Sequence, residues 1–170
     1  FPCTFDVITQ LLEAMTRGAI NFPSQLVVRL HPSYLVAYGS IEGRIMDRFR
    51  DKIEHLRETY EDLVVFRPPL MHELNDDIDM PVEDMYQLAE VMHHSDVIVT
   101  EYSTLMIEGA IVNTPVINAG LYRFRDTDHP AWYYETFTHV KRIMQTNATR
   151  NAHTLDQLVE YVNFYLEDRS

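Results

Sequence analysis

The sequence has few features that would tie it to a secreted, membrane-spanning or disulfide-stabilised protein. Its single cysteine, Cys3, excludes an internal disulfide and favours a reducing compartment. No stretch approaches the roughly 18 consecutive apolar residues of a transmembrane helix, and the first residues lack the basic-then-apolar pattern of a signal peptide. Because the chain also does not begin with Met, we expect a cytoplasmic fragment of a longer protein. Any attachment to the inner membrane face would come from regions outside this chain.

Basic residues are scarce: 14 Lys and Arg stand against 26 Asp and Glu, giving a formal net charge of −12 at pH 7. Such an acidic surface repels phosphate backbones and anionic lipids, so we expect no nucleic-acid partner. Any bound anion must be held locally, by a helix N-terminus or a few placed cations. A glycine-rich Walker or GxGxxG loop is also absent, so an ATPase or an NAD-dependent enzyme has no motif support.

Metal-ligand spacing is missing as well. His93 and His94 are adjacent and therefore fall on different faces of a helix, which makes them a poor metal pair. We expect neither a metal nor a cofactor.

The rest of the composition, 46% hydrophobic and 24% charged, is typical of a globular domain. Apolar residues at helical spacing and short continuous apolar runs alternate along the chain. The predicted helices cover residues 5–18, 45–60, 85–92, 104–112 and 155–167, the first ending at Gly18. The predicted strands cover residues 25–30, 63–66, 97–100, 115–118 and, as an edge strand, 140–143. Residues 70–81 are predicted to be a loop.

This alternation predicts an α/β fold, a Rossmann-like doubly wound parallel sheet, with residues 1–170 forming a single domain. In such folds ligands bind beyond the carboxyl ends of the strands. The candidate site residues are therefore those that follow the predicted strands.

Ser103 and Thr104 follow one of these strands, where a helix is expected to begin. Either residue is suited to be the N-cap, which is the simpler interpretation. Alternatively, their hydroxyls and the free N–H groups of the helix hold a phosphate, helped by the helix dipole.

Three charged or titratable residues extend this candidate site. His31 follows the first predicted strand and is a candidate donor to a phosphate oxygen or general acid for a leaving phosphate, although a lone histidine is more often structural. Arg29 is a second phosphate candidate, and a salt bridge is at least as good an explanation. Glu108, one turn along the predicted helix, is placed to accept hydrogen bonds from ribose hydroxyls or to be a solvated helix charge.

Two segments in this order resemble the C-terminal, donor-binding domain of GT-B glycosyltransferases. They are RLHP at residues 29–32 and SDVIVTEYST at residues 95–104, the latter followed by Glu108 and by TPVI at residues 114–117. The arrangement is most similar to CDP-glycerol glycerophosphotransferases and to HP-motif capsule polysaccharide transferases, and it is related to UDP-N-acetylglucosamine 2-epimerase. The resemblance covers residues 25–119, and the last predicted helix is also in the expected place.

The resemblance implies a role for each matching residue. His31 would contact the donor phosphate, Ser103 and Thr104 would bind phosphate oxygens, and Glu108 would bind the ribose. Glu101 stands where the teichoic-acid enzymes have aspartate, so its role stays open.

Two further donor contacts follow from the same resemblance. Tyr102 belongs to the matched segment, and Arg123 lies in a loop that reaches toward the donor in similar proteins. The aromatic residues around Arg123 equally suit a packing patch.

The implied activity is transfer from a CDP-, CMP- or UDP-linked sugar or polyol phosphate in surface polysaccharide synthesis, with no metal needed in this domain. The family's N-terminal lobe, which carries the acceptor site and usually the catalytic base, is not in this chain, so the isolated piece is expected to be inactive. The alternatives are a UDP-sugar 2-epimerase-like domain and a degenerate Rossmann-like interaction module whose pocket is closed by Tyr102 or Tyr122.

Overall fold

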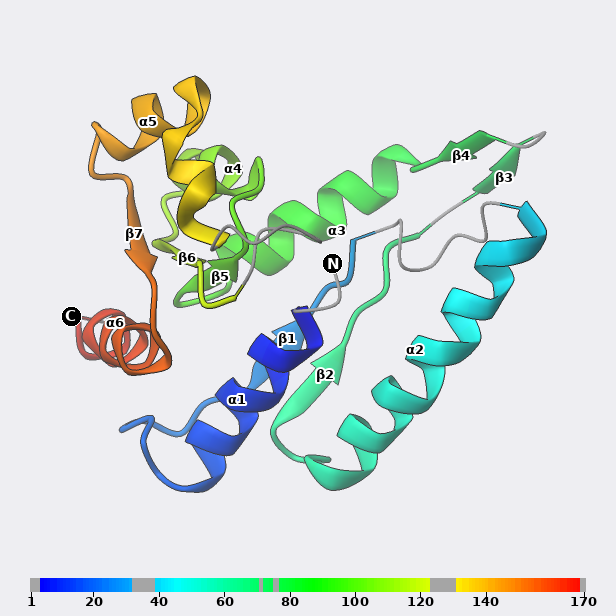
Figure 1. Cartoon of the computed structure of the whole chain (residues 1–170), viewed down its shortest axis with the longest axis horizontal. Coiled ribbons are helices and arrows are strands. Elements are labelled where there is room, and N and C mark those ends of the chain that lie inside the picture. Colours follow the sequence, from blue (N-terminus) through cyan, green and yellow to red (C-terminus); the bar gives the residue numbers. More distant parts are fainter. Residues whose placement is uncertain (1–3, 32–38, 71, 75–76, 123–130, 169–170) are drawn as a thin grey trace. The chain divides into compact units, whose positions relative to one another are not determined.

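A computed structural model describes residues 4–31, 39–70, 72–74, 77–122 and 131–168 (Figure 1). Its internal contacts divide the chain into two compact units. Unit 1 comprises Phe1–Pro23 and Ala89–Ser170, and unit 2 comprises Ser24–Leu88. The expectation that residues 1–170 form one domain stays a prediction.

Unit 2 is built on a short parallel strand pair. Strand β1 (Leu26–Val28) pairs with β2 (Val64–Phe66), so that Leu26 faces Val64 and Val28 faces Phe66. Helix α2 (Gly39–Thr59) connects the two strands, as a parallel pair requires. The strands predicted at residues 25–30 and 63–66 and the helix predicted at residues 45–60 are therefore confirmed, although both strands are shorter than predicted.

The predicted loop at residues 70–81 is wrong, because two strands lie within it. Strand β3 (His72–Leu74) pairs antiparallel with β4 (Asp77–Asp79), and His72 faces Asp79. The acidic composition suggested a loop, but strand pairing is made by backbone groups and does not require apolar side chains. Helix α3 (Val82–His93) follows and crosses the boundary between the two units.

Unit 1 contains a three-stranded parallel sheet in the order β5-β6-β7. Strand β5 (Ile98–Thr100) pairs with β6 (Val116–Ala119), which pairs in turn with β7 (Thr149–Ala152). All four residues of β6 are buried, as expected for the central strand of a covered sheet. A mixed α/β fold with parallel strands is thus established.

Helices cover this sheet. Helix α4 (Leu105–Ile111) connects β5 to β6, and a 3-10 helix, η2 (Ala131–Thr136), precedes α5 (Thr138–Met144). Figure 1 shows α4 and α5 towards one side of the sheet and α6 (Leu155–Glu167) towards the other. Side chains from α4, α5, the sheet and the connection between β5 and α4 form one buried cluster, which consists of Tyr102, Met106, Val116 and Val140.

The predicted edge strand at residues 140–143 is wrong, because this segment lies in α5. Val140, Ile143 and Met144 are spaced i, i+3 and i+4, so all three reach the same buried cluster from one face of a helix. The edge strand is β7 instead. Its sequence, TRNA, is too polar for apolar periodicity to reveal it.

Local sequence signals explain where the long helices of unit 1 begin and end. Helix α1 (Thr4–Thr16) ends in a left-handed residue, Gly18, with φ of 72°, and the N–H of Ala19 bonds to the carbonyl of Ala14 at 2.8 Å. At the start of α6, the Thr154 hydroxyl accepts the N–H of Gln157. The stop at Gly18 and the terminal helix are both confirmed.

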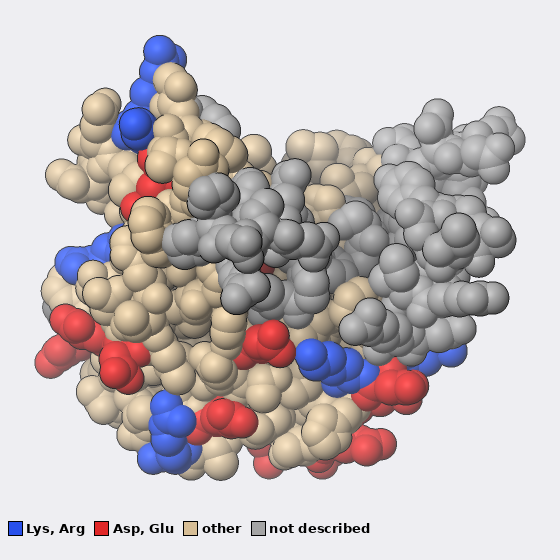
Figure 2. Space-filling view, in the orientation of Figure 1, with Lys and Arg blue, Asp and Glu red and all other residues tan. Residues whose placement is uncertain are grey.

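Described charged side chains of both signs are visible in Figure 2. On the face drawn in Figure 2, the described Lys and Arg side chains stand in small separate groups, most of them next to Asp or Glu. No helix in the described part of the chain combines the length and apolar character of a membrane span.

Candidate functional site

The predicted phosphate residues lie in the connection between β5 and α4, at the carboxyl edge of the unit 1 sheet. The Ser103 hydroxyl is 2.8 Å from the Thr100 hydroxyl and accepts the N–H of Leu105 at 3.2 Å. Thr104 occupies the N-cap position of α4 but makes no side-chain capping bond, and it is exposed. Ser103 therefore acts as the local cap, while the hydroxyl of Thr104 is on the surface.

The backbone N–H groups at the start of α4 are largely used within the protein. Those of Met106 and Ile107 donate to the carbonyls of Ser103 and Thr104, at 3.1 and 2.8 Å. A phosphate bound here would therefore meet the hydroxyls of Ser103 and Thr104 rather than these helix N–H groups.

Glu101 is the first residue after β5, and it is half-buried. Burial raises the pKa of its carboxyl group above the ordinary value, although a 2.6 Å hydrogen bond from the Thr4 hydroxyl opposes the shift. The group thus keeps its proton to a higher pH than an ordinary glutamate. Glu108 lies in the first turn of α4 and is half-buried.

Tyr102 turns inward from the same connection. Its backbone has a φ of 49°, a left-handed conformation that is uncommon for a residue with a side chain. The side chain is buried, and its hydroxyl donates to Glu135 Oε1 at 2.6 Å. Burial, followed by the hydrogen bond and charge of Glu135, raises the pKa of the phenol, so the hydroxyl remains a donor. The phenol predicted to contact the donor is thus directed at a carboxylate.

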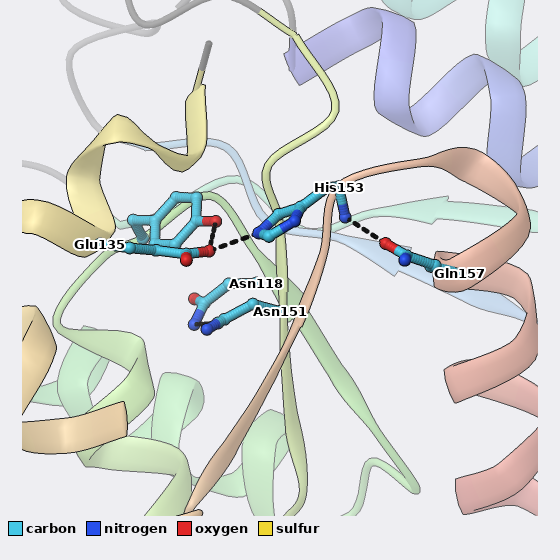
Figure 3. Close-up of polar contacts among 6 residues, drawn as sticks. Asn118, Glu135, Asn151, His153 and Gln157 are labelled. Carbon is cyan, nitrogen blue, oxygen red and sulfur yellow. Dashed lines mark hydrogen bonds and ion pairs between the residues drawn. The ribbon is translucent and has the colours of Figure 1, made fainter. Parts of the chain in front are cut away.

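Glu135 accepts a second hydrogen bond at the same oxygen. His153 Nε2 lies 2.6 Å from Glu135 Oε1, and Figure 3 shows this contact beside the bond from the His153 N–H to Gln157. The side chain of Glu135 is 17% exposed and that of His153 is 40% exposed. This pair joins η2 to the end of β7 at the carboxyl edge of the sheet.

A row of polar side chains crosses the same edge. Thr100, Asn118 and Asn151 are register partners on β5, β6 and β7, so their side chains point to one face of the sheet. Asn118 Nδ2 donates to Asn151 Oδ1 at 2.8 Å (Figure 3). The row also includes the hydroxyl of Ser103, which bonds to Thr100.

Asn118 is the least exposed member of this row. Its side chain is fully buried, and its Oδ1 has no hydrogen-bond partner among the residues that the structure describes. More than about 90% of buried polar groups in proteins have a partner, so the described residues leave this oxygen able to accept a further hydrogen bond. We name Tyr102, Asn118, Glu135, Asn151 and His153 the Glu135 cluster.

Sequence reasoning did not identify most of this cluster. Asn118 was recognisable as a polar residue at a predicted strand end. Asn151 and His153 could not be placed, because β7 was not predicted. Glu135 lies in an aromatic segment with no recognisable motif, and only its bonds to Tyr102 and His153 reveal it.

Two other predicted site residues, Arg29 and His31, belong to unit 2. Arg29 Nη2 lies 2.5 Å from Asp84 Oδ2, and Asp84 Oδ1 accepts the N–H of Leu70 at 2.6 Å. The salt bridge foreseen as the alternative for Arg29 is thus present. His31 is exposed. Arg123 lies outside the described residues.

The structure therefore brings together Glu101, Tyr102, Ser103, Thr104 and Glu108 in unit 1, and Arg29 with His31 in unit 2. Within the described ranges, His, Cys, Asp and Glu side chains form no group of three or more that could hold a metal ion. In comparisons with known proteins, no protein-family model, curated protein or solved structure matches this chain.

Proposed function

We propose that this chain binds a CDP-, CMP- or UDP-linked sugar or polyol phosphate and forms the donor half of a cytoplasmic glycosyltransferase or glycerophosphotransferase. The supporting observation is the position of the Ser103 and Thr104 hydroxyls directly after β5, at the carboxyl edge of a parallel sheet. Phosphate-bearing ligands of doubly wound α/β proteins bind at this edge. The doubly wound fold and an acceptor lobe outside this chain are parts of the proposal.

Most site residues have a stated role. Ser103 and Thr104 bind phosphate oxygens, and Glu108 accepts hydrogen bonds from the ribose. Burial raises the pKa of the Glu101 carboxyl group, and the role of this residue toward the donor stays open.

The basic residues of this proposal are those predicted from the sequence. His31 is exposed and able to donate a proton to the leaving phosphate. Arg29 is a weaker candidate, because its guanidinium group already pairs with Asp84. Arg123 remains a predicted donor contact from the sequence.

The test is the thermal midpoint of the protein with CDP, CMP and UDP. A ligand that binds only the folded state at 100 times its Kd stabilises it by about 2.7 kcal/mol, so the midpoint should rise with at least one nucleotide. Ser103→Ala and His31→Ala should abolish the rise. If none of the three nucleotides shifts the wild-type midpoint, the proposal is rejected.

Two control variants match these changes. Ser95 precedes β5 at the opposite end of the same strand, and its hydroxyl donates to the Val91 carbonyl at 2.6 Å. Ser95→Ala should retain the nucleotide response. His55 is exposed on α2 in the unit that contains His31, so His55→Ala should retain it as well.

A protein-interaction module is the second candidate function, and one surface favours it. Val82, Met85 and Tyr86 are 54%, 63% and 67% exposed, and their i, i+3, i+4 spacing places them on one face of α3. Exposed apolar patches often mark binding surfaces. If the protein self-associates, Met85→Glu should shift it towards the monomer in sedimentation velocity without altering any nucleotide response.

A further inference from the structure

We propose that the Glu135 cluster binds the hydroxyl groups of a neutral sugar or polyol. In a nucleotide-activated donor it would hold the transferred group, while the connection between β5 and α4 holds the phosphate. The assignment to the transferred group rests on the proposed function, whereas the hydroxyl-binding chemistry of the cluster does not.

The members of the cluster lie on one face of the sheet. Asn118 and Asn151 are register partners, and the next residues on the same side of their strands, two positions on, are Gly120 and His153. A side chain at Gly120 would meet the Tyr102 hydroxyl at 2.5 Å, so this hydroxyl lies directly over Gly120. Glu135 bonds to both Tyr102 and His153 and is therefore one step beyond the asparagine pair, at the same carboxyl edge.

The cluster offers acceptors that lack donors. Asn118 Oδ1 is buried without a partner among the described residues. Oε1 of Glu135 accepts both hydrogen bonds of this side chain. Among the described residues Oε2 has no donor, so it can accept a hydrogen bond from a ligand hydroxyl. Two nearby acceptor oxygens match a ligand with more than one hydroxyl, because a hydroxyl donates one hydrogen bond and still accepts others.

The charge of the cluster favours a neutral ligand over an anionic one. Glu135 contributes a negative charge, and His153 is the one member able to become positive. Among the described residues near the cluster, the cation of Arg150 lies over the Phe164 ring at 4.3 Å and donates to the Tyr165 hydroxyl at 3.2 Å. Residue 150 also alternates to the opposite side of β7 from Asn151. A phosphate would meet an unfavourable carboxylate here, whereas a hydroxyl would not.

An exposed aromatic ring lies next to the His153 side chain. Trp132 is 42% exposed, and its ring centroid is 5.9 Å from that of His153. An indole presents a broad apolar face, and ligand sites combine such faces with a few polar groups that fix orientation. The C–H face of a sugar or polyol fits the indole while its hydroxyls reach the carboxylate.

Trp132 also provides the measurement, because it is the only tryptophan in the chain. Its fluorescence and its quenching by acrylamide are to be compared for the protein alone, with UDP or CDP, and with UDP-glucose or CDP-glycerol. We expect a sugar- or polyol-linked nucleotide to lower the acrylamide quenching constant at least twofold beyond the effect of the matching nucleotide. Equal quenching with the linked and the bare nucleotide would overturn the inference and leave the proposed function intact.

Two variants test the residues. Asn118→Leu removes the unpaired oxygen, and Glu135→Gln removes the charge while preserving the size of the side chain. Each should abolish the added protection by the sugar or polyol and leave binding of the bare nucleotide unchanged. Thr149→Val is the matched control, because Thr149 Oγ1 is also buried without a partner among the described residues but lies at the other end of β7. Loss of protection in Thr149→Val as well would contradict the assignment to the cluster.

Failure of nucleotide binding is a separate outcome. If UDP and CDP do not bind the wild-type protein, the proposed function fails, and the cluster is then tested with free glucose and glycerol at high concentration. A saturable change in Trp132 fluorescence that is lost in Asn118→Leu would support the inference. No change with either compound would overturn it.

Discussion

The Tyr102 hydroxyl donates to Glu135 Oε1 at 2.6 Å and thereby joins two residues that are 33 positions apart in the chain. Tyr102 adopts a left-handed backbone conformation, and its ring stacks on Tyr134 at a centroid distance of 5.8 Å. A residue held in a sparsely populated conformation needs compensation from its surroundings. The contacts of the Tyr102 side chain with Tyr134 and Glu135 provide it.

Tyr102→Phe tests the strength of this bond. A hydrogen bond to a charged group contributes about 1.5–3 kcal/mol, so the free energy of unfolding in urea should fall by about that amount. Tyr86→Phe is the control, because Tyr86 is 67% exposed and should change the stability very little. An unchanged urea midpoint in Tyr102→Phe would mean that the bond adds nothing to stability.

Asn118→Leu should increase the stability of the protein although it removes an oxygen that we propose binds the ligand. An unpaired buried polar group costs about 1–3 kcal/mol, so replacing the amide with an apolar side chain of similar size should increase the free energy of unfolding by about 1 kcal/mol. Asn151 is half-exposed and can turn its amide to water. Lower stability in calorimetry would instead indicate that a buried water already satisfies Asn118 Oδ1.

Glu101→Gln should alter the pH dependence of stability. Burial raises the pKa of the folded carboxyl group above 4.5, so the folded state binds the proton more tightly than the unfolded state. The resulting stabilisation is fully present below about pH 4.5 and is lost as the pH rises through the raised pKa. Relative to Glu101→Gln, the wild type should therefore lose stability as the pH rises through this interval.

Thermal midpoints between pH 4 and 8 measure this difference. Glu13→Gln removes a charge from an exposed position on α1 and serves as the control for net charge. If the midpoints of wild type and Glu101→Gln run parallel over the whole range, the burial of Glu101 has no effect on its proton affinity.

Arg29→Met should destabilise unit 2. Among the described residues, it leaves the carboxylate of Asp84, whose side chain is 2% exposed, with the N–H of Leu70 as its partner. Breaking a buried ion pair from one side costs about 3–5 kcal/mol, which chemical denaturation would detect. Adding Asp84→Asn should restore part of this loss, because the amide still accepts from Leu70 and carries no charge. No recovery in the double variant would exclude an uncompensated charge as the cause.

The fold was largely predictable wherever one local pattern dominated. Apolar residues at helical spacing predicted α1, α3 and α6, and continuous apolar runs predicted β1, β2, β5 and β6. The pattern failed where it was short or absent. The sequence predicts a strand over residues 140–143, because four residues are too few to separate a helix face from a buried strand. Strand β7 was missed because its polar sequence gives no period.

In the candidate site, too, the sequence predicted the position of some residues but not the contacts that they make. Sequence order alone placed Ser103 and Thr104 at the start of a helix and Arg29 beside a strand end, because strand ends and helix starts are local features. The sequence also limited the choice for Arg29 to an anion or a salt bridge. In the folded structure Arg29 forms the salt bridge with Asp84, 55 residues away, which presents a buried carboxylate at 2.5 Å.

By itself, then, the sequence determined the α/β class, the acidic surface and the hydroxyl-bearing strand ends, all of which depend on neighbouring residues. Only the tertiary structure decided which polar side chains meet. Asn118 pairs with Asn151 because β6 and β7 are in register, and Glu135 reaches Tyr102 and His153 because η2 lies against the sheet edge. Hydrogen bonds act over about 3 Å, so partners that are distant in sequence are selected only by the packing of the elements that carry them.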